Sequence, residues 1–283
     1  MPESLPIVRT VADLRAEVAM WRRRSSRIAL VPTMGALHAG HLALIAAARQ
    51  RADCVVASIF VNPAQFGPHE DFDRYPRDQA SDAAALAGTG CDLLYAPEVS
   101  AMYPAGFATT VSVAALANRL CGAARVGHFD GVATVVTKLL MQATPDVALF
   151  GEKDWQQLTI IRRLVCDLDL PIEIAGVPIV RDADGLALSS RNRYLNPAER
   201  VQALTLPRAL GAARAALLAG EDAATTLTHA HTTLRAGGFH RVDYVALTGA
   251  DDLEPLTRFD RPARLLAAAW LGTTRLIDNL GVG

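Results

Sequence analysis

Short apolar runs alternate with amphipathic stretches over roughly the first 180 residues of the chain. The runs are bounded by glycine, proline or polar residues, and they cover residues 28–31, 54–61, 91–97, 146–151 and 172–180. A strand buried on both faces of a sheet reads as such a continuous apolar segment. The stretches between them have helical spacing, for example residues 10–21, 132–142 and 155–165. Alternating strands and helices predict an α/β fold with a doubly wound, parallel, Rossmann-like sheet.

The pattern changes from about residue 195 onward. Two alanine-rich amphipathic helices are predicted over residues 199–219 and 222–236, and strand-like runs follow at 242–247, 263–271 and 275–280. The first of these helices should begin at Asn196, with proline next and Glu199 placed to complete a capping box. Helices followed by strands indicate a smaller α+β domain. We therefore expect a catalytic domain over residues 1–180 and a C-terminal α+β domain over residues 181–283.

Residues 28–41, Ile-Ala-Leu-Val-Pro-Thr-Met-Gly-Ala-Leu-His-Ala-Gly-His, predict a strand, a glycine-containing loop and the start of a helix. His38 and His41 are spaced to share one face of the first helical turn. A helix N-terminus offers free N–H groups and a positive dipole end, and Gly40 leaves room for a phosphate to approach the backbone. The alternative is a pair of ordinary surface histidines near a helix cap. The strand–loop–helix setting favours a nucleotide triphosphate site.

Polar residues follow two other predicted strands, where ligands bind in open α/β sheets. Asn62 and Gln65 come after the second strand, and their amides would suit a small polar substrate, although Asn62 equally suits a simple turn. Lys153 follows the fourth strand and would place a compact positive charge near phosphate oxygens, unless it belongs to a solvated charge cluster. Gln157, one turn into the next helix, is placed to point into the same crevice.

Two further loops carry candidate chemistry. Ser189, Ser190 and Arg191 would present two hydroxyls and a fixed cation. His128 lies in a glycine-bounded turn just before the predicted helix 132–142, where it either caps the helix or faces a ligand. Neither a Walker loop nor a G-x-G-x-x-G fingerprint occurs in the sequence, which disfavours P-loop kinases and nicotinamide enzymes. The histidines, with Lys153 and Arg191, suit attack on an α-phosphate.

Composition adds limits on partners and location. The chain has 283 residues, of which 51% are apolar and 20% charged, with a formal net charge of −1. This balance gives no bias toward nucleic acid or membranes, and the basic run 22–27 is read as a solvated helix end. The N-terminus lacks the pattern of a secretory signal, so a cytoplasmic protein is expected. The four cysteines form no Cys-x-x-Cys pair, and Cys54, Cys91 and Cys166 are predicted to be buried free thiols.

Several motifs stand in an order that resembles the pantothenate synthetase (pantoate–β-alanine ligase) family. They are Pro-Thr-Met-Gly-Ala-Leu-His-Ala-Gly-His at 32–41, Phe-Val-Asn-Pro-Ala-Gln-Phe at 60–66, Tyr-Pro-Arg at 75–77, Phe-Gly-Glu-Lys-Asp at 150–154, Leu-Ser-Ser-Arg-Asn-Arg-Tyr at 188–194 and Leu-Gly-Thr-Thr-Arg-Leu-Ile-Asp-Asn at 271–279. The resemblance covers nearly the whole chain and places it in the nucleotidyltransferase group that carries His-x-Gly-His. It implies that pantoate and Mg·ATP form a pantoyl adenylate, which β-alanine converts to pantothenate and AMP.

The resemblance also implies roles for residues. His41 would be the proton donor and His38 a phosphate ligand, Gln65 would bind pantoate and lie beside β-alanine, and Gln157 would hold the pantoate hydroxyls. Lys153, Ser189, Ser190 and Arg191 would contact the phosphates, the last three in a mobile clamp. Residues implied to bind ATP are Met34, Gly35, Ala36, Leu37, His38, Ala39, Gly40, His41, Gly151, Glu152, Lys153, Asp154, Val180, Leu188, Ser189, Ser190 and Arg191. Asn62 is kept as a substrate candidate.

For the metal, Mg²⁺ is expected to be coordinated mainly by phosphate oxygens and water, with Asp82 as a weak candidate for an outer contact. Members of the family are usually homodimers, so a homodimer is expected. Leu188 and Trp155 replace a methionine and a tyrosine common in the family, which should alter packing rather than chemistry. The rival functions are an adenylyltransferase that stops at the nucleotidyl product and an ATP-binding module without turnover.

Overall fold

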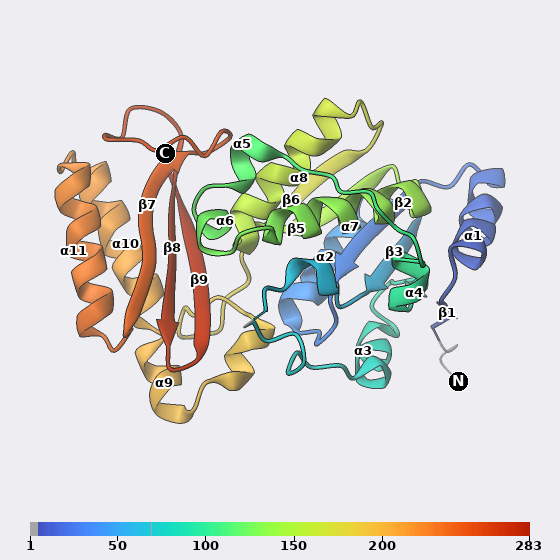
Figure 1. Ribbon diagram of the computed structural model, residues 1–283, viewed down its shortest axis with the longest axis horizontal. Coiled ribbons are helices and arrows are strands. Elements are labelled where there is room, and N and C mark those ends of the chain that lie inside the picture. The colour runs from blue at the N-terminus through green and yellow to red at the C-terminus, as the bar shows by residue number, and fades with distance from the viewer. Residues whose placement is uncertain (1–4, 69) are drawn as a thin grey trace.

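The first part of the chain forms a parallel sheet of six strands in the order β1-β4-β3-β2-β5-β6 (Figure 1). The structure, a computed structural model, describes residues 5–68 and 70–283. Residues 1–4, to which the expectation about a secretory signal refers in part, lie outside the described residues. The strands are β1 Ile7–Val8, β2 Ile28–Thr33, β3 Cys54–Ile59, β4 Leu93–Tyr95, β5 Val147–Gly151 and β6 Glu173–Val177, and each neighbouring pair is parallel. The predicted α/β fold with a doubly wound sheet is confirmed.

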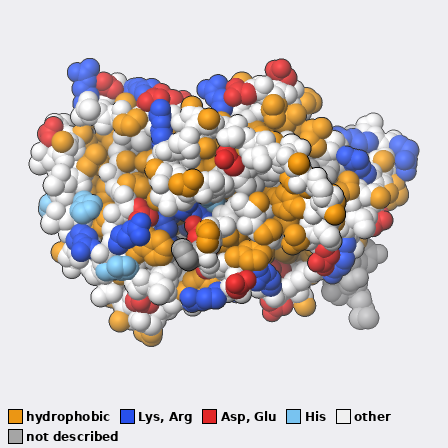
Figure 2. Space-filling model, viewed as in Figure 1, with side chains coloured by type: hydrophobic (Ala, Val, Ile, Leu, Met, Phe, Trp, Pro, Cys, Tyr) orange, Lys and Arg blue, Asp and Glu red, His pale blue; other side chains and the backbone are white. Residues whose placement is uncertain are grey.

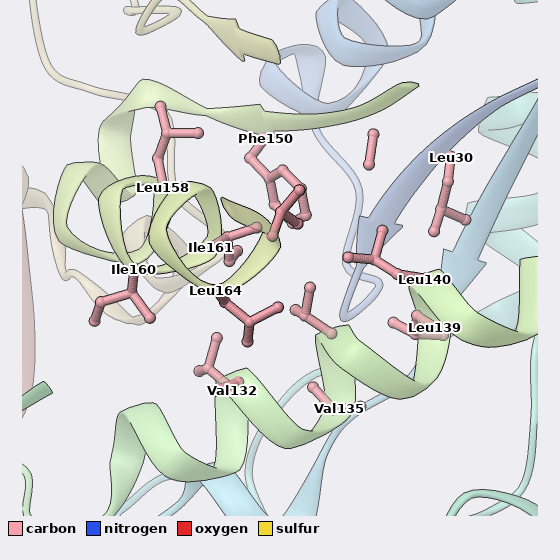
Figure 3. Close-up of a cluster of buried hydrophobic side chains, with 14 of the residues drawn as sticks. Leu30, Val132, Val135, Leu139, Leu140, Phe150, Leu158, Ile160, Ile161 and Leu164 are labelled. Atoms are coloured by element: carbon pink, nitrogen blue, oxygen red, sulfur yellow. The ribbon is translucent and has the colours of Figure 1, made fainter. Parts of the chain in front are cut away.

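Helices cover both faces of this sheet, which explains the unbroken apolar runs. In β2, Ile28 and Leu30 belong to the buried cluster that contains α7 (His128–Ala143) and α8 (Trp155–Asp167). Ala29 and Val31, which point to the opposite face, belong to the cluster formed with α2 (Ala39–Arg49) and α3 (Gln79–Leu86). Figure 3 shows side chains of α7 and α8 packed together beside Phe150 and Leu30. The helix α1 (Val11–Arg23), capped by Thr10, contributes Leu14 to the same face as α7 and α8.

The position of β2 locates the site. It pairs with β3 on one side and with β5 on the other, so the chain leaves β2 in one direction and returns beside it much later. In such sheets the loops at the carboxyl ends of the two strands diverge and leave a crevice. The histidine loop follows β2 and the Lys153 turn follows β5, so both open into this crevice.

The second part of the chain is a three-stranded antiparallel sheet of β7 (Arg241–Gly249), β8 (Ala263–Leu271) and β9 (Thr274–Val282). In Figure 1, α10 (Thr205–Leu218) and α11 (Ala223–Ala236) lie on one side of this sheet, and their buried residues share a hydrophobic cluster with it. The predicted smaller α+β unit is confirmed as a fold. Shorter helices connect the larger elements: η1 Pro63–Gln65, α4 Val99–Met102, α5 Ala114–Ala117, α6 Cys121–Ala124, η2 Glu152–Asp154, η3 Ser190–Tyr194 and α9 Pro197–Gln202.

Three sequence predictions need correction. The strand β1 was not predicted, because two residues at a sheet edge carry no periodic signal. The single helix expected over 199–219 is two helices, α9 and α10; Pro207, in the first turn of α10, lacks an N–H and cannot continue a helix from α9. The Asn196–Glu199 capping box at the start of α9 is present. Cys166 is exposed on the solvent side of α8 and Cys54 is half-buried, whereas Cys91 is buried as predicted.

Candidate active site

The crevice beside β2 holds a cavity of about 230 Å³. Its lining residues come from several separate segments of the chain between Pro32 and Arg191. A larger cavity of about 610 Å³ adjoins it, between the two sheets, and shares several of its lining residues. Most of the predicted site residues line the smaller cavity: Met34, His38, Gly40, His41, Gln65, Gly151, Lys153, Asp154, Gln157, Val180, Leu188, Ser189, Ser190 and Arg191. Figure 2 shows basic side chains in the middle and left of this face of the molecule, as well as along its top, right and lower edges. Residues from distant parts of the sequence are thus brought together.

The two histidines form a reciprocal cap at the start of α2. Nδ1 of His38 accepts a hydrogen bond from the Gly40 N–H at 3.1 Å, and Nδ1 of His41 accepts one from the His38 N–H at 3.2 Å. Since both Nδ1 atoms are acceptors, a neutral imidazole at either position carries its proton on Nε2. The ring centroids are 4.1 Å apart. The cap therefore fixes two Nε2–H donors side by side at the cavity.

Burial keeps both imidazoles neutral at neutral pH. Desolvation, with help from the Lys153 charge, lowers the pKa of His38 to about 4. Desolvation and the neighbouring His38 lower the pKa of His41 to about 3. A side chain at position 40 would approach the His38 ring to 2.9 Å, so glycine is required between the two histidines. The pair is built to donate hydrogen bonds to an anion rather than to carry a charge of its own.

The loop between β2 and α2 is held from beneath by Asp82. Its carboxylate accepts hydrogen bonds from the backbone N–H groups of Ala36 at 2.9 Å and Leu37 at 2.8 Å. Gly35 and Ala36 both have positive φ, and a Cβ at Gly35 would lie 2.8 Å from the Asp82 carboxylate. Asp82 is buried and does not line either cavity. It supports the histidine loop and is not placed as the outer magnesium contact that was suggested from the sequence.

The turn after β5 places Lys153 at the cavity and is held by the C-terminal sheet. Nδ2 of Asn279, in β9, donates to the carbonyls of Glu152 and Lys153, each at 2.9 Å. Glu152 itself points away from the smaller cavity and pairs with Arg264 at 3.1 Å. Gln157, in the first turn of α8, lines both cavities as expected for a residue facing the crevice.

The Ser-Ser-Arg loop closes the cavity from the side of the C-terminal region. Oγ of Ser190 donates to the carbonyl of Ala36 at 3.1 Å, which ties this loop to the histidine loop. Oγ of Ser189 accepts from the Arg191 N–H. The Arg191 guanidinium makes a two-point ion pair with Asp71, at 3.0 and 2.9 Å. The guanidinium expected to clamp phosphate is therefore paired with a carboxylate of the chain itself.

Gln65 and Asn62 have different surroundings. Gln65 lines the smaller cavity, with its amide nitrogen against the Met34 sulfur. Asn62 is buried: its Nδ2 donates to Gln65 Oε1 and to the carbonyl of Gly131, and its Oδ1 accepts from the Tyr103 hydroxyl. All of its polar atoms are engaged inside the protein, so it positions Gln65 rather than facing a substrate. Five of the residues expected to bind ATP likewise do not line the smaller cavity: Gly35, Ala36, Leu37, Ala39 and Glu152.

Sequence reasoning missed several residues around the cavity. Glu70 and Asp71 are consecutive, and they pair with Arg125 and Arg191 respectively. Arg125 also contacts His128, the residue whose orientation the sequence left open. Burial lowers the pKa of His128 to about 4, with the Arg125 charge as the next cause. A signal for Arg125 was available, since it stands two residues before Gly127, where the glycine-bounded turn that contains His128 begins.

Neither a metal cluster nor a membrane span was found in the parts of the chain that the structure covers. Within residues 5–68 and 70–283, no group of three or more His, Cys, Asp or Glu side chains is arranged to hold a metal ion. Among the helices of those same ranges, none is long and apolar enough to cross a membrane.

Comparison with known proteins gives a consistent result across the chain. Residues 6–281 match the family model for pantoate-β-alanine ligase. A pantothenate synthetase from Rhizorhabdus wittichii is 62% identical over 98% of this chain and 99% of its own. The crystal structure of pantothenate synthetase from Thermus thermophilus superposes with a TM-score of 0.93 at 50% identity, covering 98% of this chain and 99% of the other. Pantoate-β-alanine ligase from Francisella tularensis, crystallised with β,γ-ATP and β-alanine, gives a TM-score of 0.81 at 32% identity, covering 98% and 97%.

Proposed function

The chain belongs to the pantoate–β-alanine ligase family, whose reaction condenses pantoate with β-alanine to pantothenate, and we propose that it works through a pantoyl adenylate. In the first step the pantoate carboxylate attacks the α-phosphorus of ATP and pyrophosphate leaves. In the second step the amine of β-alanine attacks the acyl carbon and AMP leaves. The observation that carries this proposal is the convergence of two fixed imidazole N–H donors, an ammonium and a guanidinium on one cavity.

In the first step, negative charge grows on the phosphate oxygens and on the departing pyrophosphate. The Nε2–H groups of His38 and His41 would donate to these oxygens, and the Lys153 ammonium would stabilise them by charge. Such donors are already oriented before the reaction, which is why losing one typically costs about 10²- to 10³-fold in rate. A bound triphosphate would also raise the pKa of His41 from its low value and so support its expected role as proton donor.

Arg191 would act by exchanging partners. Its guanidinium is paired with Asp71 in the structure, and phosphate offers the same two-point geometry with more charge. Ser189 and Ser190 would add hydroxyl donors beside it. Val180 lines the same cavity and offers an apolar contact for adenine. Asp154 is half-exposed at the cavity edge, where the ribose hydroxyls would lie.

The acid substrate would lie between Gln65 and Gln157. Both amides line the smaller cavity, and each offers a donor and an acceptor suited to the hydroxyls and carboxylate of pantoate. Mg²⁺ would enter with ATP, held by phosphate oxygens and water, because no protein cluster in the described ranges is arranged for it. A homodimer, a cytoplasmic location and a division into domains 1–180 and 181–283 complete the proposal. The separate buried cluster drawn from residues 186–282 supports this division.

The two-step scheme is tested by isotope exchange and product analysis. Pantoate alone should support exchange of labelled pyrophosphate into ATP, since the first step is complete without the amine. AMP should be released at a steady rate only when β-alanine is added as well. Exchange without any β-alanine-dependent AMP release would indicate an adenylyltransferase that stops at the nucleotidyl product. Absence of pantoate-dependent exchange would overturn the proposal.

A further inference from the structure

A tight turn, residues 119–122, leads from α5 into α6 at the boundary with the C-terminal sheet (Figure 1). The Gly122 N–H closes it by donating to the Arg119 carbonyl at 2.7 Å. The turn packs closely against α5, since a Cβ at Gly122 would overlap the carbonyl oxygen of Ala117. Leu120 has a φ of 48° and a ψ of −117°, values of a type II′ turn that normally belong to glycine. Such a strained conformation persists only where neighbouring groups hold it in place.

The side chain of Gln156, in the first turn of α8, holds this tight turn. Its Oε1 accepts from the Cys121 N–H at 3.0 Å, and its Nε2 donates to the carbonyls of Leu116 at 2.9 Å and Arg119 at 2.7 Å. Gln156 is 3% exposed, so these hydrogen bonds are made away from bulk water, where losing them is costly. The next residue, Gln157, lines both cavities. The amide that holds the turn and an amide proposed to bind pantoate therefore occupy adjacent positions of one helix.

Turn 119–122 is also a place where the C-terminal sheet contacts the first part of the chain. Sγ of Cys121 lies 3.0 Å from the Tyr244 hydroxyl of β7, and 3.4 and 3.5 Å from the two terminal nitrogens of Arg275 in β9. Nε of Arg275 donates to Asp243 at 2.8 Å, and the Asp243 side chain is 3% exposed. Since this buried carboxylate fixes the guanidinium within the sheet, its contact with Cys121 fixes the sheet relative to the turn.

The strand that contacts this turn also holds Lys153. Arg275 and Asn279 both belong to β9, and Asn279 donates to the Lys153 carbonyl at 2.9 Å. Lys153 stands three residues before Gln156 along the chain. The contacts thus form a closed ring that runs from the start of α8 through turn 119–122 and β9 back to the turn that precedes α8. Loosening one contact of such a ring changes the geometry at the others.

We propose that Gln156 is a positioning residue for Lys153, because it holds turn 119–122 in the strained conformation that fixes β9 in place. This inference depends on the proposed function, since it takes the Lys153 ammonium to stabilise the triphosphate. Without the Gln156 side chain, the turn should relax toward an unstrained conformation and move Cys121 away from Arg275. β9 would then shift with respect to α8, and the ammonium would no longer be held where the phosphates are proposed to bind.

The central test is Gln156→Met, which keeps the length of the side chain and removes its three hydrogen bonds. Because a displacement of about 1 Å in a positioned group costs about 100-fold in rate, kcat for pantoate-dependent pyrophosphate exchange should fall about 100-fold. The KM for pantoate should stay within about threefold, since Gln65 and Gln157 keep their side chains. Gln142→Met is the matched control, because this glutamine of α7 is 7% exposed, lines neither cavity and accepts from the Tyr95 hydroxyl. Its exchange kcat should stay near the wild-type value.

A rescue experiment separates positioning from a general loss of structure. Glycine adopts the Leu120 conformation without strain, so Leu120→Gly should preserve the shape of the turn when the Gln156 amide is missing. In the Gln156→Met background, Leu120→Gly should therefore raise the exchange kcat at least about tenfold. A double-mutant cycle tests the route through Lys153. In the Lys153→Ala background, Gln156→Met should lower the exchange kcat by less than about threefold, because the group that it positions is gone.

A variant on the other side of the ring keeps the test available if Gln156→Met does not fold. Arg275→Lys retains a positive charge beside Asp243 but lacks the planar fork that also reaches Cys121. The contact between β9 and turn 119–122 is then lost while Gln156 is intact, and the exchange kcat should fall about tenfold.

The outcomes separate the hypotheses. A near-wild-type exchange kcat in a folded Gln156→Met or Arg275→Lys protein would overturn the inference. A Gln156→Met protein that Leu120→Gly does not make faster would overturn it too, because the amide would then act by some other means than the turn. A full additional loss in the Lys153→Ala background would also refute it, by showing that Gln156 acts on another group. Absence of pantoate-dependent exchange in the wild-type protein would instead refute the proposed function.

Discussion

Asn279 offers the sharpest test of how the C-terminal sheet supports the turn that carries Lys153. Its side chain is 1% exposed, and it donates to the carbonyls of Glu152 and Lys153 and accepts from Nε of Arg264 at 2.7 Å. Asn279→Ala leaves two partly buried carbonyls and one guanidinium N–H without these partners. Each group left without a partner costs about 1 to 2 kcal/mol, and small movements of the neighbouring groups reduce the total. The free energy of unfolding should therefore fall by about 2 to 4 kcal/mol.

The same change should slow the chemistry. The two carbonyls belong to Glu152 and Lys153, so releasing them would let the Lys153 ammonium move away from the place where the phosphates are proposed to bind. A displacement of about 1 Å in a positioned group costs about 100-fold in rate. We therefore expect kcat for pantoate-dependent pyrophosphate exchange to fall about 100-fold, while the KM for pantoate changes little because Gln65 and Gln157 are untouched.

The assay combines urea unfolding with exchange kinetics on three variants. Asn279→Asp has the same shape and keeps the contact with Arg264, but it faces two carbonyls without a donor, so its exchange rate should fall at least as far as that of Asn279→Ala. Asn118→Ala is the matched control, since that exposed amide makes one hydrogen bond, to the carbonyl of Ala114. If Asn279→Ala loses stability but keeps its exchange kcat within twofold, the positioning argument is refuted.

Three other predictions concern the acidic and histidine groups of the site. The pKa of His41 is lowered by burial to about 3, so the unfolded chain takes up a proton first as the pH falls below 6.5. Because of this residue, the free energy of unfolding should decrease by about 2 kcal/mol between pH 7 and 5. In His41→Gln, the decrease measured by urea unfolding over the same pH range should be smaller by about that amount. Asp82→Asn loses an acceptor for the histidine loop and should raise the KM for ATP about tenfold. The Mg²⁺ concentration for half-maximal rate should not move, and a shift would restore Asp82 as a metal contact. Asp71→Asn frees Arg191 and should lower the KM for ATP, whereas a higher KM would mean that Asp71 orients the guanidinium.

The convergence of several candidate residues on one cavity was predictable because these residues follow strand ends. Several groups expected to touch a substrate stand just after a predicted strand or at a helix start, as His41 and Lys153 do, whereas Ser189, Ser190 and Arg191 come from a separate loop. Parallel strands end at one edge of a sheet, so local patterns were enough to bring these side chains together. The pairing of β2 with β5, on which their proximity depends, follows from the doubly wound topology.

The supporting contacts were not predictable in the same way. Asp82 reaches the histidine loop across 46 positions of the sequence, and Asn279 reaches Lys153 across 126. No periodicity links such residues, and Asp82 reads as an ordinary polar position of a helix. Asp82 was expected only as a weak candidate for an outer magnesium contact, whereas in the folded loop both of its carboxylate oxygens accept hydrogen bonds from backbone N–H groups.

A physical signal for the supports of the active site was nevertheless present in β9. Asp278 and Asn279 are adjacent in a strand interior, a place from which both residue types are normally depleted. The side chains of adjacent residues point to opposite faces of a strand, so Asp278 and Asn279 make contacts on different faces of β9. Asp278 pairs with Arg181, which follows Val180, and Asn279 holds the Lys153 turn. Residues such as Asp278 and Asn279 are unfavourable in a strand, but they are kept where their contacts with distant residues stabilise the structure by more than the strand loses. Here the two contacts fix both loops, which line the smaller cavity, to a single strand, so displacement of β9 should disturb both sides of the proposed ATP site together.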